Sequence, residues 1–204
     1  MSETKTQLIY AQLKKDILNL KYNLDDVINE QVVAEEYKTS KTPVREALAM
    51  LVQEGFLVKH PRRGYFIKEI NLTEYYELLQ YRFMVELGII NYIITNCEEE
   101  SIRSLLQYTP PVVVTLESFK IENKRFHMAM AHLTQNRYMI SALETIFELN
   151  VRQTAVEGFN KIKDDMHQDH RRIVEAMLER DIAKAKAIVI RELERSDDTT
   201  HCLK

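Results

Sequence analysis

Residues 40–67 read SKTPVREALAMLVQEGFLVKHPRRGYFI, and this stretch decides the fold of the first part of the chain. Within it an apolar residue recurs at positions i, i+3, i+4 and i+7, which is the spacing of one buried helix face. The residues on that face are Val44, Ala47, Leu48 and Leu51. We expect Thr42 to cap this helix, Pro43 to take its first position and Gly55 to end it.

Two short strand candidates follow the helix. They are FLVKH at 56–60 and YFIKEI at 65–70, and PRRG at 61–64 supplies the turn between them. A strand, a turn that contains proline and glycine, and a second strand together predict a β-hairpin.

Two amphipathic helices precede this region, at 6–19 and at 30–37, and Asn29 is placed to cap the second. Three helices followed by a hairpin are the order of a winged helix-turn-helix. We therefore predict such a DNA-binding fold at 38–66, inside a first domain of residues 1–70.

The rest of the chain, residues 71–204, is predicted to be a helical second domain. The whole sequence has only 4 Gly and 4 Pro among 204 residues, and sheets need more turn residues than that. Helical periodicity gives about six helices and no convincing strand. The expected ranges are 73–96, 98–107, 116–134, 137–158, 160–179 and 181–197. The expected fold class is therefore mostly α, a winged helix-turn-helix followed by an all-α bundle.

The charge is distributed unevenly. The net charge is −3, yet residues 38–68 hold seven basic side chains against two acidic ones. A local basic patch on a negative body attracts phosphate, so nucleic acid is the expected partner of the first domain.

Several other classes are disfavoured. No apolar run is long enough to span a membrane, and the N-terminus has no apolar signal core. Cys97 and Cys202 lie far apart and do not form a disulfide framework. We expect a cytoplasmic protein without a membrane anchor.

The surface that reads DNA can be predicted from the third helix and the hairpin. A helix in the major groove reads base edges with side chains near its N-terminus, and the hairpin tip reaches the adjacent groove or backbone. The predicted DNA-binding residues are Lys41, Thr42, Arg45, Arg62, Arg63 and Gly64. Lys14 and Lys15 could add phosphate contacts. A merely solvated basic face is the alternative, and the capped helix with its hairpin speaks against it.

The stretch at 40–67 resembles the GntR family of bacterial transcription regulators. The resemblance rests on Ser-x-Thr-Pro-Val-Arg-Glu-Ala-Leu, on Glu-Gly at the helix end, and on Arg-Gly before the last strand. Lys41 stands where arginine is usual and Phe56 where leucine is usual. The resemblance implies a homodimer that binds a palindromic operator, usually as a repressor relieved by a small effector.

Residues 71–204 resemble the FCD ligand-binding domain of the FadR-like branch, in its six-helix form. The matching segments are ENKRFHMAMAHLTQN (122–136) and DHRRIVEAMLERDIAKAKAIVIRELE (169–194). In that domain one Asp and three His commonly hold a divalent metal. The corresponding positions here are Asn123, His127, His170 and Glu192, so Asn replaces Asp and Glu replaces the last His.

Zinc, nickel or manganese would suit two imidazoles and a carboxylate. The alternative is that the metal has been lost and these residues line a cavity or bind the effector directly. His132 and His167 are expected to be ordinary surface or structural histidines.

The effector-binding candidates are Arg82, Glu86 and Arg152, with Asn123 beside them. The segment LLQYRFMVE (78–86) resembles an Arg-x-x-x-Glu helix of the family, which implies that Arg82 holds a carboxylate of the effector. A structural ion pair from Arg82 to Glu86 at i+4 is an equal alternative.

The favoured function is a ligand-responsive DNA-binding transcriptional regulator, a repressor and not an enzyme. The alternative is a metal-dependent helical-bundle enzyme in which His127, His170 and Glu192 leave an open position that activates water. The sequence lacks an HExxH motif and a Gly-rich phosphate loop, which disfavours catalysis. An architectural DNA protein would not need the second domain.

Overall fold

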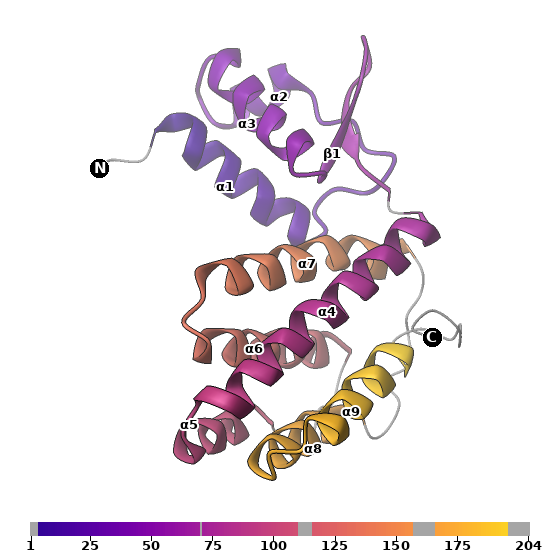
Figure 1. Ribbon diagram of the computed structural model, residues 1–204. Coiled ribbons are helices and arrows are strands. Elements are labelled where there is room, and N and C mark those ends of the chain that lie inside the picture. Colours follow the sequence, from indigo (N-terminus) through magenta and orange to yellow (C-terminus); the bar gives the residue numbers. More distant parts are fainter. Residues whose placement is uncertain (1–3, 70, 110–115, 157–165, 196–204) are drawn as a thin grey trace. The chain divides into compact units, whose positions relative to one another are not determined.

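The computed structural model describes residues 4–69, 71–109, 116–156 and 166–195 (Figure 1). These form two compact units, one of residues 4–69, 71 and 151–156 and one of residues 72–109, 116–150 and 166–195. Helices dominate both units, and the two strands of the described residues form one small sheet. The expected fold class is confirmed.

The first unit has the element order of a winged helix. Its elements are α1 (Lys5–Leu18), α2 (Glu30–Glu36), α3 (Lys41–Gln53), β1 (Leu57–His60) and β2 (Gly64–Ile67). The strands are antiparallel, and their register pairs Leu57 with Ile67 and His60 with Gly64. An isolated bridge between Ile28 and Tyr65 adds the chain before α2 to the free edge of β2.

The core of this unit lies on the predicted face of α3. All four stripe residues, Val44, Ala47, Leu48 and Leu51, are completely buried. Helix α3 packs against α1, of which Ile9, Leu13 and Ile17 are buried. These three residues are also spaced as one face of a helix. This packing holds the opposite face of α3 toward solvent.

The start of α3 differs from the prediction. Ser40 is the N-cap, and Thr42 and Pro43 are the second and third helical residues, so the expectation that Thr42 caps the helix was wrong by two positions. The first four N–H groups of a helix have no partner within the helix, and a proline is therefore tolerated anywhere in that turn. Pro43 marks the first turn but does not fix its first residue.

The end of α3 forms a Schellman motif around Gly55. Glu54 is the C-cap, and Gly55, the next residue, has a φ of +79°. Gly55 N donates to Val52 O at 3.0 Å, and Phe56 N donates to Leu51 O at 2.9 Å. Gly55 thus ends the helix as predicted, one residue beyond the cap.

Four other helices end on a residue with a side chain in the same left-handed conformation. These residues are Leu20, Lys38, Gln135 and Arg180, after α1, α2, α6 and α8. A Cβ in this conformation costs about 1–2 kcal/mol, which is why glycine is usual there. Their use explains how a helical chain forms so many helix ends with so few glycines.

The second unit is a helical bundle. Its elements are α4 (Leu72–Asn96), α5 (Glu99–Ser104), the 3-10 turn η1 (Leu105–Tyr108), α6 (Leu116–Leu133), α7 (Arg137–Val156), α8 (Met166–Leu178) and α9 (Ile182–Arg195). The last residues of α7, 151–156, group with the first unit. The helix expected at 98–107 is divided into α5 and η1. Residues 157–165 and 196–197, in which the predicted helices 137–158, 160–179 and 181–197 have some of their ends, lie outside the described residues.

In this unit α4 contacts α6, α8 and α9, and α8 also contacts α6 and α9. Helices α8 and α9 pack side by side (yellow in Figure 1), and Ile173 and Val174 of α8 and Ala185 and Val189 of α9 are all buried. Side chains that face inward from these helices therefore meet in the interior of the bundle.

None of the described helices combines the length and the apolar character needed to cross a bilayer. Cys97 has a free thiol, and Cys202 lies outside the described residues.

The left-handed helix ends give a stability prediction. Gln135→Gly should raise the free energy of unfolding by about 1 kcal/mol, because glycine removes the strained Cβ at φ 52° from an exposed residue. Urea denaturation measures the change. Gln135→Ala keeps the Cβ and should show no such gain, and an equal gain in both variants would contradict the explanation.

Candidate functional site

The N-terminal end of α3 and the turn after β1 expose the basic residues predicted to contact DNA. Lys41 and Thr42 are exposed in the first turn of α3, and the Arg45 side chain is 61% exposed one turn later. Arg62 and Arg63 are exposed in the turn between the strands. Both groups belong to the first unit and have the exposure that a DNA-binding surface requires.

Lys14 and Lys15 differ from each other in this respect. Lys15 is exposed, whereas the Lys14 ammonium lies 3.0 Å from Glu54 and above the ring of Phe56. Lys14 therefore serves packing between α1 and α3.

Gly64 is required by packing within the unit. Its φ is +117°, and a Cβ at this position would lie 2.9 Å from Val27 Cγ1 and 3.2 Å from Ile28 O. The chain segment before α2 therefore lies closer to β2 than a residue with a Cβ at position 64 would allow. The DNA contact predicted for Gly64 stays a prediction.

An acidic residue that sequence reasoning missed holds Arg45. Glu30, the first residue of α2, accepts hydrogen bonds from Arg45 Nε at 3.2 and 3.1 Å and from Arg45 Nη2 at 2.9 Å. The Tyr65 hydroxyl of β2 donates to the same carboxylate at 3.2 Å. The hydrogen bond from Arg45 lowers the pKa of Glu30 below its ordinary value. No periodicity links Glu30 to Arg45, 15 residues later, so no sequence signal marked it.

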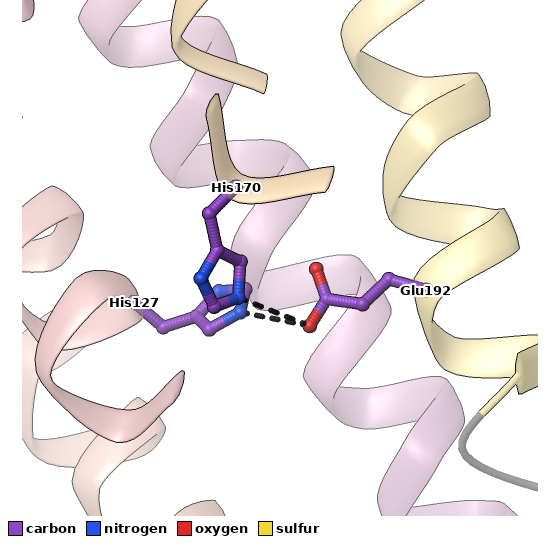
Figure 2. A group of neighbouring side chains, drawn as sticks. All are labelled: His127, His170 and Glu192. Carbon is purple, nitrogen blue, oxygen red and sulfur yellow. Dashed lines mark hydrogen bonds and ion pairs between the residues drawn. The ribbon is translucent and has the colours of Figure 1, made fainter. Parts of the chain in front are cut away.

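The second unit buries a cluster of titratable side chains. Glu192 of α9 faces His127 of α6 and His170 of α8, the two imidazoles lie next to each other, and the three side chains point toward one another (Figure 2). His127 Nε2 is 2.9 Å and His170 Nε2 is 3.8 Å from Glu192 Oε1. One nitrogen or oxygen atom from each residue lies within 4.8 Å of the others.

Asn123 completes the group of four positions carried over from the family. It lies one turn before His127 on α6, and its Oδ1 is 3.0 Å from His170 Nε2. The ring of Phe126 stacks on that of His170 with 4.3 Å between centroids. Phe126, which sequence reasoning did not single out, fixes the plane of His170.

Arg82 of α4 lies in the same cluster. Its Nε donates to Glu86 Oε1 at 2.7 Å, so the structural ion pair at i+4, one of the two alternatives for Arg82, is present. Its Nη2 lies 3.2 Å from Glu192 Oε1 and 3.1 Å from His127 Nε2. Phe147 of α7 covers the guanidinium, with 4.6 Å from Cζ to the ring centroid.

The buried charges shift the pKa values of one another. Burial would lower the pKa of His127, but the carboxylates of Glu86 and Glu192 outweigh burial and raise it to about 9. Burial lowers the pKa of His170. Burial opposes ionisation of Glu192, yet the imidazole of His127 holds its pKa well below its ordinary value. Arg82 and a protonated His127 thus balance the charges of two carboxylates.

No protonation state of His127 satisfies both of the polar atoms that face its Nε2, the donor Nη2 of Arg82 and the acceptor Oε1 of Glu192. If His127 Nε2 carries a proton for Glu192, it presents a donor to the donor Nη2 of Arg82. If it does not, two acceptors lie 2.9 Å apart. The second carboxylate oxygens of Glu86 and Glu192 are buried and find no hydrogen-bond donor among the described residues. The cluster therefore has more buried acceptor atoms than its own donors satisfy.

The residues present fit one divalent cation. Two imidazoles and a carboxylate are a typical ligand set, and a cation would accept the lone pairs that face one another. His127 Nδ1 lies 3.1 Å from Glu86 Oε1, although the two are not aligned as a hydrogen bond. A carboxylate in that place orients an imidazole ligand. Arg82 Nη2 contacts two of the ligand atoms and competes with a cation for them.

The remaining candidates lie elsewhere. Arg152 belongs to α7, but its side chain is outside the described residues, as is that of His167 on α8. His132 is exposed in the last turn of α6, in agreement with the expectation of a surface histidine.

Two family models match the chain, one over its N-terminal part and one over most of the remainder. The model described as "Bacterial regulatory proteins, gntR family" matches residues 5–67, and the model of the FCD domain matches residues 77–195.

Curated relatives of this chain are named as transcriptional regulators. An uncharacterized HTH-type transcriptional regulator, YdhC of Bacillus subtilis, is 26% identical over 89% of this chain and 84% of its own. The HTH-type transcriptional repressor GlaR of Escherichia coli is 22% identical over 90% of each chain. The enzyme alternative finds no support among these relatives.

Solved structures share the fold. McbR/YncC of E. coli has a TM-score of 0.72 at 16% identity over 95% of both chains. A GntR protein from Rhodococcus sp. RHA1 has a TM-score of 0.75 at 15% identity, also over 95% of both chains.

The buried cluster gives a prediction that needs no ligand. Arg82→Met should lower the free energy of unfolding by about 3–5 kcal/mol, because it leaves two buried carboxylates with one fewer cation. Thermal and urea denaturation measure the loss. Arg103→Met is the matched control, since Arg103 forms an exposed i,i+4 pair with Glu99, and it should change stability by about 0.5 kcal/mol at most. Equal losses of unfolding free energy in the two variants would show that Arg82 does not compensate the buried carboxylates.

Proposed function

The chain belongs to the GntR family of bacterial regulatory proteins, as a member with an FCD domain, and we propose that it is a repressor whose hold on its operator is set by a small effector. It acts as a homodimer on a palindromic operator. Residues 1–70 bind DNA, and residues 71–204 bind the effector and the second subunit. The name of the E. coli relative, a transcriptional repressor, supports repression as the direction of control.

The observation that carries the DNA-binding part is the exposed basic end of α3 beside an arginine-bearing hairpin. Lys41, Thr42 and Arg45 reach the major groove, and Arg62 and Arg63 reach the neighbouring backbone or minor groove. Gly64 allows the hairpin turn to lie close to the duplex.

The effector site is the buried cluster of the second unit. A divalent ion, of zinc, nickel or manganese, is held by His127, His170 and Glu192, with Asn123 alongside. The ion takes over contacts that Arg82 makes with His127 and Glu192. Arg82 is then available to pair with a carboxylate of the effector, and Glu86 anchors its Nε. Arg152, on α7, is a further candidate for effector binding.

DNA binding is tested with a labelled duplex that covers the region upstream of the protein's own gene. Arg45→Ala should weaken binding by about 1–3 kcal/mol, or roughly 5- to 150-fold in Kd, because an arginine at a base or phosphate is lost. Fluorescence anisotropy at several salt concentrations measures Kd and its salt slope. Arg103→Ala, in the other unit, should bind like the wild type. An Arg45→Ala protein of unchanged affinity would refute the assignment of α3.

Metal binding is tested by calorimetric titration of dialysed protein with Zn²⁺, Ni²⁺ or Mn²⁺. We expect about one ion per chain and a higher Tm with metal than in chelator. His170→Gln should abolish binding, while His132→Gln, at an exposed histidine of α6, should leave it intact. Absence of heat with all three ions, together with a Tm unchanged by chelator, would remove the metal from the proposal and leave the effector bound by the side chains alone.

A further inference from the structure

We infer that Glu30 is a positioning residue for base recognition: it holds Arg45 so that the far edge of its guanidinium meets a guanine of the operator. This inference rests on the proposed DNA binding by α3. Glu30 touches Arg45 and not the DNA, and it acts through Arg45.

The contact uses one particular edge of the guanidinium. Arginine has one N–H on Nε and two on each Nη, in a planar fork. Glu30 accepts from Nε at 3.2 and 3.1 Å and from Nη2 at 2.9 Å, so the side edge of Arg45 is occupied. The end edge, formed by Nη1 and the second N–H of Nη2, remains available for a base. Two parallel N–H groups on that edge match the O6 and N7 acceptors of guanine.

The carboxylate that holds Arg45 is itself anchored. Glu30 is the first residue of α2, and Asn29 caps this helix by accepting from Gln31 N at 2.7 Å. The Tyr65 hydroxyl donates to Glu30 at 3.2 Å, and the Glu30 side chain is only 20% exposed. Arg45 is 61% exposed and would otherwise sample many rotamers. Anchoring removes this freedom before DNA binds, so less is lost on binding.

The charge of Glu30 points to selectivity and not to general affinity. A carboxylate beside the DNA surface repels phosphate, and its pairing with Arg45 reduces the positive charge that Arg45 offers to the backbone. If Arg45 only bound phosphate, the Glu30 carboxylate would weaken that binding. If Arg45 reads a base, the same carboxylate fixes the direction of its guanidinium.

The experiment compares sequence preference with general affinity. Wild type and Glu30→Gln, as full chains, each select from a library of randomised DNA duplexes, and bound duplexes are sequenced. Affinity for a poly(dA)·poly(dT) duplex is measured in parallel. Glu30→Gln is nearly isosteric and removes the charge and one acceptor for Arg45. We expect preference for guanine at one position of each half-site to fall about five- to tenfold, while affinity for poly(dA)·poly(dT) stays equal or rises.

Two control variants separate positioning from folding. Glu46→Gln alters another carboxylate, on α3 itself and bonded to Thr6, and should keep the full guanine preference. Arg45→Lys keeps the charge but has no fork, so it should lose the same guanine preference, and the double variant Glu30→Gln/Arg45→Lys should lose no more than either alone.

The opposing outcomes are distinct. Unchanged guanine preference in Glu30→Gln overturns the inference, and so does a parallel loss of selected and poly(dA)·poly(dT) binding, which indicates a structural role only. A wild-type protein that enriches no sequence would refute the proposed function and this inference with it.

Discussion

Two carboxylates buried inside a helical bundle must be neutralised, and this constraint determines how the second unit is built. Glu86 and Glu192 come from different helices, and the cations that balance them, Arg82 and His127, lie on α4 and α6. Removing any one of these charges leaves another uncompensated in a medium that solvates it poorly. With His170 of α8, the cluster connects four helices at one point, and a ligand that changes its charge balance acts on all of them together.

The two units use charged groups in opposite ways. In the first unit Arg45, Arg62 and Arg63 are exposed, and the buried interior is mostly apolar, with aliphatic side chains such as Leu48 and Leu51. The second unit also buries a charged cluster, in which two carboxylate oxygens have no donor in the described part of the chain. An exposed arginine can meet a rigid polyanion without rearrangement of the fold. A buried site with spare acceptors responds instead to a small cation or to a ligand that brings donors.

The sequence was sufficient to predict those elements that depend on residues close together in the chain. The α3 stripe, the hairpin and the cap at Asn29 each depend on spacings of a few residues, and Asn123, His127, His170 and Glu192 came from a family resemblance. What it could not predict were contacts between distant residues. Glu30 reaches Arg45 through tertiary packing, and the contact of Arg82 with Glu192 spans 110 positions. The cap of α3 was misplaced because proline is tolerated throughout the first turn of a helix.

The close approach at Gly64 has a consequence for how the DNA is shaped. Ile28 and Tyr65 exchange two backbone hydrogen bonds, at 2.8 and 3.1 Å, and the absent Cβ of Gly64 lets the two segments meet. The hairpin is thereby joined to the chain that leads into α2, and it cannot swing independently of the helices. A duplex that contacts both α3 and the hairpin tip must adapt its own groove width to this fixed spacing. The stiffness of base pairs that no side chain touches then becomes part of operator preference.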